Sequence, residues 1–413
     1  MTIGIEGVAP AAPPAMSIDV AAERARTIGT AQRHYFNAAG AGLMSDSVVE
    51  AVVSHLRLEQ RIGGYEAGGA AAAGIDSVYS SAAALLGADI DEIALFDSAT
   101  SGLRGVFDAL RLGPGDTVIA PRSSYVSQAL RLLALERYDG VELVLLPNDS
   151  SGALDLEALE RALENAPGRT VVSAVHVPTS SGLVEPVAAI SALARRFGAI
   201  TVLDATQSVG QLDIDVRAIG CDALVTTGRK FLRGPRGTGI LFLRRGLLDG
   251  IGAWAPDVRG SLWTGAEEWS MDGTARTLET WESSVALRLG LGVALREALD
   301  RGMAATEAHL VALGAVLREG LSGIGGVSIA DPPASPSGIV TFTVAGAEGK
   351  QVSMRLREAG VDSLAIPASH AQWDLGARGL ASVVRVSPHV YTDDSDVEAL
   401  LAAVSSVAVG TAR

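Results

Sequence analysis

The stretch Ile200-Thr201-Val202-Leu203-Asp204 decides the fold, because an apolar and β-branched run leads directly into a carboxylate. Such a run is typical of a buried strand in a parallel sheet, and ligands of these sheets bind at the carboxyl ends of the strands. A second apolar run, Cys221 to Val225, leads in the same way toward Lys230. The sequence therefore predicts two strands that end at one edge of a sheet, one followed by an acid and the other by an amine.

Lysine is rare in this chain, and one lysine is the amine at this sheet edge. Of the 33 basic residues only Lys230 and Lys350 are lysines, so arginine serves almost everywhere else. Arginine keeps its proton near neutral pH, whereas a buried or charge-flanked lysine can lose it and attack a carbonyl carbon. Lys230 is therefore a candidate nucleophile, and an ordinary anion-binding cation is the alternative. For Asp204 the alternative is a helix cap or a turn aspartate.

An acid and a carbonyl-condensing lysine are the two groups that pyridoxal phosphate (PLP) needs. The carboxylate keeps the pyridine nitrogen protonated, and the lysine binds the aldehyde and later moves protons. Three motifs follow one another here: Asp204-Ala205-Thr206-Gln207-Ser208-Val209-Gly210, Thr227-Gly228-Arg229-Lys230 and Gly234-Pro235-Arg236-Gly237-Thr238-Gly239. This ordered set resembles the core of class V aminotransferase-family enzymes of fold type I. Within that family the chain is similar to isopenicillin N epimerase-like proteins and to C–S lyases of cysteine conjugates, such as hercynylcysteine sulfoxide lyases.

The resemblance implies an α/β protein built as a fold type I PLP enzyme. Such an enzyme has a large domain with a mostly parallel, seven-stranded sheet and a small α+β C-terminal domain, and the alternation of strands and helices along this chain agrees with it. The expected divisions are 1–45 for an N-terminal tail and a lead-in segment, 46–282 for the large PLP-binding domain, and 283–413 for the small domain with its linking helix.

Candidate cofactor-binding residues follow the ends of the predicted strands. Ser98 begins a predicted helix, and the free N–H groups at a helix N-terminus can bind a phosphate, although any helix can start with such a cap. The resemblance implies that this segment holds the PLP phosphate together with Thr227 and Arg229. It also implies that Tyr125 stacks on the pyridine ring, while Gln207 approaches the phenolic oxygen. The complete predicted set is Ser98, Ala99, Thr100, Tyr125, Thr179, Asp204, Gln207, Thr227, Arg229 and Lys230.

Two further residues are candidates for binding the substrate. Arg385 lies between apolar strand residues, and the family arginine at this place binds the substrate α-carboxylate as a bidentate pair. Asn37 lies in the lead-in segment, which passes near the substrate in relatives, but asparagine is also a turn residue. The segment Arg276 to Glu282 resembles one that crosses to the partner's active site, so the resemblance implies a homodimer with shared active sites.

A carboxylate clamp combined with PLP implies an amino acid substrate. Desulfurases carry a nucleophilic cysteine in the loop before the late arginine, and Asp362 to Ser382 contains none. The first hypothesis is therefore β-elimination from an S-substituted cysteine or its sulfoxide, in which Lys230 removes the Cα proton and thiol or sulfenate, pyruvate and ammonia are released. The alternatives are decarboxylation-coupled oxidative deamination, transamination or epimerisation. A binding or regulatory protein with the same fold also stays open.

Composition excludes several other classes of protein. The net charge of −14 disfavours binding to nucleic acid or to an anionic membrane. A single cysteine, Cys221, excludes an internal disulfide and a multi-cysteine metal site, and no metal is expected. No run is long and apolar enough to span a bilayer, and the Ala- and Pro-rich stretch 9–15 is interpreted as a flexible tail and not as a signal peptide. A cytoplasmic protein is expected.

Overall fold

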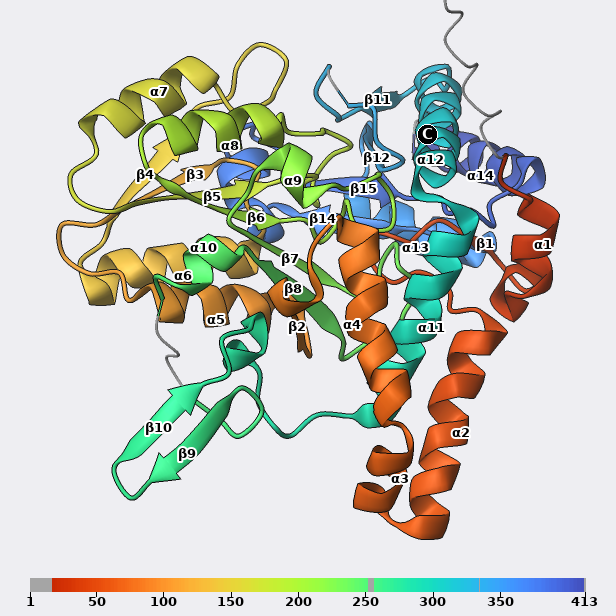
Figure 1. The fold of residues 1–413 in the computed structure, drawn as a ribbon. Coiled ribbons are helices and arrows are strands. Elements are labelled where there is room, and N and C mark those ends of the chain that lie inside the picture. Colours follow the sequence, from red (N-terminus) through yellow and green to blue (C-terminus); the bar gives the residue numbers. More distant parts are fainter. Residues whose placement is uncertain (1–16, 252–255, 334, 412–413) are drawn as a thin grey trace, which may run out of the picture.

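The computed structural model describes residues 17–251, 256–333 and 335–411, so the predicted tail at 9–15 lies outside the described residues. A seven-stranded sheet forms its centre (Figure 1). The strand order is β2 (Ile93–Phe96), β8 (Gly239–Leu243), β7 (Ala223–Thr227), β6 (Ile200–Asp204), β5 (Thr170–Val175), β3 (Thr117–Pro121) and β4 (Glu142–Leu146). Only β8 runs antiparallel to its neighbours in this sheet, so the predicted fold class is confirmed.

Helices cover both faces of this sheet (Figure 1). One face carries α7 (Leu156–Asn165) and α8 (Val187–Arg196), and the other carries α5 (Ala99–Leu110) and α6 (Val126–Ala134). A parallel sheet needs this arrangement, because its strands are apolar on both faces and must be shielded from water on each. The carboxyl ends of β5, β6 and β7 are consequently left open at one edge.

A smaller sheet forms the C-terminal part of the protein. Its order is β11 (Val327–Ile329), β12 (Val340–Val344), β15 (Ser382–Val386) and β14 (Leu364–Pro367), all antiparallel. It packs with α12 (Met303–Ser322), α13 (Gly349–Glu358) and α14 (Asp394–Thr411), as the predicted α+β pattern requires. The domain boundaries remain a prediction.

The other elements belong to neither of these two sheets. Helix α11 (Val285–Arg301) packs on α2 (Asp46–Ile62) and α4 (Ala72–Leu86), while β9 (Ser261–Gly265) and β10 (Glu268–Met271) form a projecting hairpin (Figure 1). The remaining short elements are α1 (Val20–Ala25), η1 (Ile28–Ala31), β1 (His34–Tyr35), α3 (Gly64–Ala70), η2 (Ile90–Glu92), η3 (Leu135–Asp139), α9 (Val216–Ile219), α10 (Arg245–Leu248), η4 (Ala275–Leu278), β13 (Val361–Asp362), η5 (Ala368–His370) and η6 (Gln372–Gly376).

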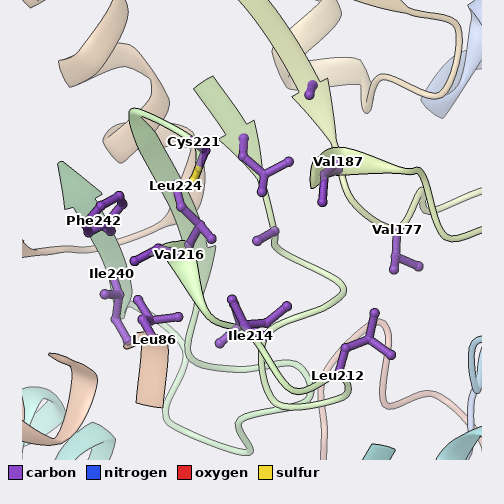
Figure 2. Close-up of a cluster of buried hydrophobic side chains, with 14 of the residues drawn as sticks. Leu86, Val177, Val187, Leu212, Ile214, Val216, Cys221, Leu224, Ile240 and Phe242 are labelled. Carbon is purple, nitrogen blue, oxygen red and sulfur yellow. The ribbon is translucent and has the colours of Figure 1, made fainter. Parts of the chain in front are cut away.

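Apolar side chains fill the spaces between the large sheet and its helices. Figure 2 shows Cys221 beside Val216, Leu224 and Phe242 in one of these clusters. Burial raises the pKa of its thiol to about 12, so Cys221 is a buried structural thiol and not a reactive one. Among the helices that the structure describes, none combines the length and the apolar composition needed to cross a membrane.

Candidate active site

A cavity of about 370 Å³ lies at the carboxyl ends of β5, β6 and β7, beside the N-terminus of α5. The sheet brings there residues that are as far apart in the sequence as Ser98 and Lys230, because parallel strands all end at the same edge. All ten predicted cofactor-binding residues line this one cavity. Its other lining residues are Asp97, Leu103, Ser127, Val175, Val177, Thr206, Arg236 and Gly237.

Lys230 lies in the turn after β7, and its side chain is buried in the cavity wall. Its Nζ atom is 5.9 Å from the centroid of the Tyr125 ring. Burial and the nearby charges of Arg229 and Arg385 hold the pKa of this amine well below its ordinary value, against the opposing effect of Asp204. A lowered pKa makes it easier for the amine to lose its proton, and the neutral amine is the form that attacks an aldehyde.

Asp204 ends β6 with a buried carboxylate at the cavity wall. One of its carboxylate oxygens accepts a hydrogen bond of 2.9 Å from the backbone N–H of Thr206. Gln207 follows on the same turn, and its Nε2 donates to the carbonyl of Ala39. Its buried Oε1 has no partner within the described part of the chain. Because a buried oxygen without a partner is costly, a bound molecule with a hydrogen-bond donor would be stabilised at this position.

The other end of the cavity is suited to a phosphate. Ser98 caps α5 by accepting a hydrogen bond from the N–H of Ser101, and this end of a twelve-residue helix lines the cavity. Arg229 lies opposite and donates a hydrogen bond to the carbonyl of Gly40. Burial and the nearby charge of Arg236 lower the pKa of Arg229. A carboxylate, a buried lysine, an aromatic ring and an anion site together fit PLP.

Arg385 and Asn37 are not among the residues that line the cavity, in contrast to the other predicted site residues. Arg385 is buried directly behind its wall, where Nη1 donates to the carbonyl and the hydroxyl of Thr179, at 3.2 and 2.6 Å. Burial lowers the pKa of Arg385 to about 10. Asn37 pairs with Ser387 in an isolated parallel bridge. Arg385 Nε and Asn37 Oδ1 are both buried without a partner among the residues described.

Sequence reasoning missed two contributions to the site. Asp97, Ser127 and Arg236 line the cavity, and each stands within two residues of a predicted site residue or inside a quoted motif, which is the signal that was available. Glu185 was not indicated at all: it accepts a hydrogen bond of 2.8 Å from Ser123, two residues before Tyr125. Burial raises the pKa of Glu185 to about 7. This buried acid holds the turn that presents Tyr125.

The His370 ring is stacked against Tyr125, with centroids 6.4 Å apart and planes inclined by 8°. His370 ends η5, a short helix in the segment between β14 and β15. The small sheet thereby reaches the ring that lines the cavity.

The seven-stranded sheet, with a lysine and a carboxylate at its carboxyl edge, defines a PLP-dependent enzyme of fold type I. The family described as Aminotransferase class-V matches residues 34–400, and the chain belongs to this family, whose cofactor is PLP.

Three similar proteins illustrate the relationship. A probable hercynylcysteine sulfoxide lyase from Mycobacterium tuberculosis is 29% identical over 382 residues, which are 91% of each chain. A probable cysteine desulfurase 2 from Mycobacterium leprae is 31% identical over 338 residues, 78% of each chain. Among solved structures, an apo cysteine desulfurase from Thermococcus onnurineus NA1 superposes with a TM-score of 0.87, 23% identity and coverage of 96% of this chain and 99% of that one.

Proposed function

We propose that this enzyme is a C–S lyase that performs β-elimination on an S-substituted cysteine or its sulfoxide. The observation that carries the proposal is the absence of a usable thiol: the sequence has one cysteine, Cys221, and it is buried among apolar side chains. The segment next to Tyr125, residues 362–382, contains no cysteine. The lack of an accessible cysteine argues against transfer of sulfur to the protein as a persulfide, which supports release of the sulfur with the product. Similarity to a sulfoxide lyase along 91% of both chains supports the same conclusion.

Three residues have separate roles in the proposed reaction. Arg385 binds the substrate α-carboxylate through the guanidinium that now contacts Thr179. Lys230, whose pKa is lowered by burial and by neighbouring arginines, holds the cofactor and then accepts the Cα proton. When bound, PLP supplies the electron sink that stabilises negative charge at Cα, and Asp204 keeps its ring nitrogen protonated.

The reaction balances with water as the only co-reactant. The Cα proton passes to Lys230, the Cβ–S bond breaks, and its electron pair leaves on sulfur. Sulfur then takes up a proton and departs as a thiol, or as a sulfenic acid when the substrate is a sulfoxide. Hydrolysis of the remaining three-carbon unit yields pyruvate and ammonia, and no oxidant or reductant is consumed.

Product analysis tests this proposal. PLP-loaded protein is incubated with S-methyl-, S-benzyl- and S-(2-carboxyethyl)-cysteine, with their sulfoxides and with free cysteine. We expect pyruvate and the matching thiol or sulfenate in equal amounts, measured by mass spectrometry. We expect Cys221→Ala, which adds no polar group to the apolar cluster, to retain wild-type activity within about twofold because the buried thiol takes no part. Alanine with persulfide would establish a desulfurase. Carbon dioxide with an aldehyde, or an inverted amino acid, would establish decarboxylative deamination or epimerisation. Each of these outcomes contradicts the proposal.

We also infer a homodimer that uses the β9–β10 hairpin. Leu262 and Trp263 point to opposite faces of β9, yet they are 66% and 78% exposed, and Trp269 and Met271 of β10 are exposed as well. A projecting hairpin with apolar side chains on both faces is expected to be covered by another surface. A second copy of this chain is the occupant that the family resemblance favours.

Light scattering during size-exclusion chromatography measures this assembly. We expect a mass of twice 42.3 kDa for the wild type and a shift toward 42.3 kDa for Trp263→Glu, since a buried charge without a partner opposes association. Tyr138→Glu is the control, because Tyr138 is an aromatic residue that is 77% exposed and belongs to η3, not to the hairpin. A wild-type monomer, or an equal effect of both variants, would contradict a hairpin-mediated dimer.

A further inference from the structure

Arg233 and Arg385 are the two largest side chains that are fully buried among the described residues, and Arg233 lies three positions after Lys230. Its φ of 60° is in the left-handed region, where only one other non-glycine residue of the described chain is found. Left-handed backbone at an arginine is unfavourable and persists only where surrounding contacts hold it. The contacts that hold Arg233 therefore also determine the shape of the turn that carries the lysine.

Every edge of the Arg233 guanidinium is bound by a segment distant in the sequence. Nη1 donates to Glu23 Oε2 at 2.6 Å, and Nη2 donates to Thr27 Oγ1 at 2.5 Å. Nε donates to the carbonyl of Leu43 at 2.8 Å, while the guanidinium lies over the ring of Tyr391 at 5.1 Å. Glu23 belongs to α1, which precedes the family-matched residues 34–400.

The backbone of the turn transmits this hold to the lysine. The N–H of Arg233 donates to the carbonyl of Lys230 at 3.0 Å and closes the turn. Gly42 packs on the same carbonyl so closely that a Cβ atom there would stand 2.6 Å from it. One residue further, the carbonyl of Phe231 is bonded by Nε2 of His389, 2.9 Å away. Movement of the Arg233 side chain would thus displace the Lys230 backbone directly.

Helix α1 is itself anchored to the C-terminal part of the chain by Arg24. Arg24 donates to the carbonyl of Tyr391 at 2.8 Å and to the carboxylate of Asp396 at 2.6 Å, near the start of α14. Glu23 is also paired with Arg26 and Arg301, so one buried carboxylate serves three arginines. Helix α1 is therefore bonded both to the turn of Lys230 and to the C-terminal part of the chain, and such supporting contacts are what keep a reactive residue in position.

We propose that Glu23 and Arg233 form a positioning pair through which α1 holds the turn of Lys230 in the geometry needed for covalent attachment of PLP. This inference rests on the proposed role of Lys230 as the attachment residue. Arg233 and Glu23 touch neither cofactor nor substrate; they act through the Lys230 backbone. Without the pair, the turn relaxes, water reaches the lysine amine and its attack on the aldehyde slows.

The experiment compares two arginines of the same cluster. Arg233→Met removes the hydrogen bonds that join the turn of Lys230 to Glu23, Thr27 and Leu43. Glu23 remains paired with Arg26 and Arg301. Arg301→Met is the matched control. The Arg301 side chain is only 6% exposed, pairs with the same Glu23 carboxylate and donates a hydrogen bond to Thr306 of α12, and among the described residues it makes no hydrogen bond or ion pair to the turn. Full-length apoprotein is mixed with PLP at a series of pH values, reduced with borohydride at intervals, and the PLP attached to the Lys230 peptide is quantified by mass spectrometry.

For Arg233→Met we expect attachment to Lys230 at least tenfold slower than in the wild type, with the midpoint of its pH dependence moved upward because a hydrated lysine regains its proton more easily. For Arg301→Met we expect both quantities to stay near the wild type, even if the melting temperature falls. Equal attachment rates and midpoints in the two variants would overturn the proposal.

If Arg233→Met does not fold, Arg233→Lys replaces it, since lysine can reach Glu23 but cannot also bond Leu43 and Thr27. For this variant we expect a rate of PLP attachment between those of the wild type and Arg233→Met. A wild-type rate would overturn the proposal. A wild-type protein that gives no labelled Lys230 peptide refutes the attachment role itself. Labelling that is insensitive to Arg233 refutes the positioning pair alone.

Discussion

Replacing Lys230 with alanine is expected to lower the rate of substrate breakdown by about 10⁴-fold or more, because one side chain holds the cofactor and also accepts the Cα proton. General acid–base catalysis alone contributes about 10²–10⁴-fold, and loss of covalent attachment adds to it. Among the described residues that line the cavity there is no second lysine and no histidine to take over this role. Initial rates of pyruvate release from an S-substituted cysteine measure the effect.

The chain supplies a direct control for this experiment. Lys350 is its only other lysine, and it lies exposed in the first turn of α13. We expect Lys350→Ala to retain wild-type rates within about twofold, as surface substitutions usually do. We expect Lys230→Arg to be as inactive as Lys230→Ala, since arginine restores the charge but cannot condense with an aldehyde. Partial recovery of Lys230→Ala by added methylamine would support the role of an amine. An active Lys230→Ala protein would contradict the proposed role of Lys230.

The cofactor-binding residues could be predicted from the sequence because the strands of a parallel sheet all end at the same edge. Each short apolar run followed by polar residues predicts a strand whose end lies at one edge, and the family resemblance then implied which residues at these ends form the site: Tyr125, Thr179, Asp204 and Lys230. No distance between these residues is needed for the prediction. Periodicity does not report the direction of a short buried strand, so the sequence did not indicate that β8 runs antiparallel between β2 and β7.

Contacts that depend on side chains from distant segments were beyond the sequence. Nothing near Glu185 in the chain indicates that it holds the turn of Tyr125 through Ser123. In the same way, Arg233 stands 210 positions from Glu23, and only the folded chain brings the two charges together. An arginine that follows a motif can face solvent, a phosphate or a carboxylate, and burial alone decides which. Polar contacts between segments that are distant in the sequence could therefore not be predicted from it.

A sharper test of substrate binding comes from Arg385, for which we expect Arg385→Lys to lower kcat/KM by about 10²–10³-fold. Loss of one partner in a buried, hydrogen-bonded charge pair costs about 2–5 kcal/mol, and lysine cannot reproduce the two parallel bonds of a guanidinium to a carboxylate. The buried Nε of Arg385 has no partner within the described residues, which leaves a donor free for that carboxylate. Steady-state kinetics with an S-substituted cysteine give the ratio.

The assignment is separated from a general loss of structure by changing the ligand instead of the protein. The S-substituted cysteamine lacks the α-carboxylate but keeps the amine and the sulfur, so its binding to the wild type and to Arg385→Lys should differ by less than about threefold. Arg378→Lys, in the same C-terminal part and paired with Asp374, should leave both ligands unaffected. If Arg385→Lys weakened the cysteamine as much as the amino acid, Arg385 would be supporting Thr179 and the cavity wall, and the carboxylate would have to be bound elsewhere.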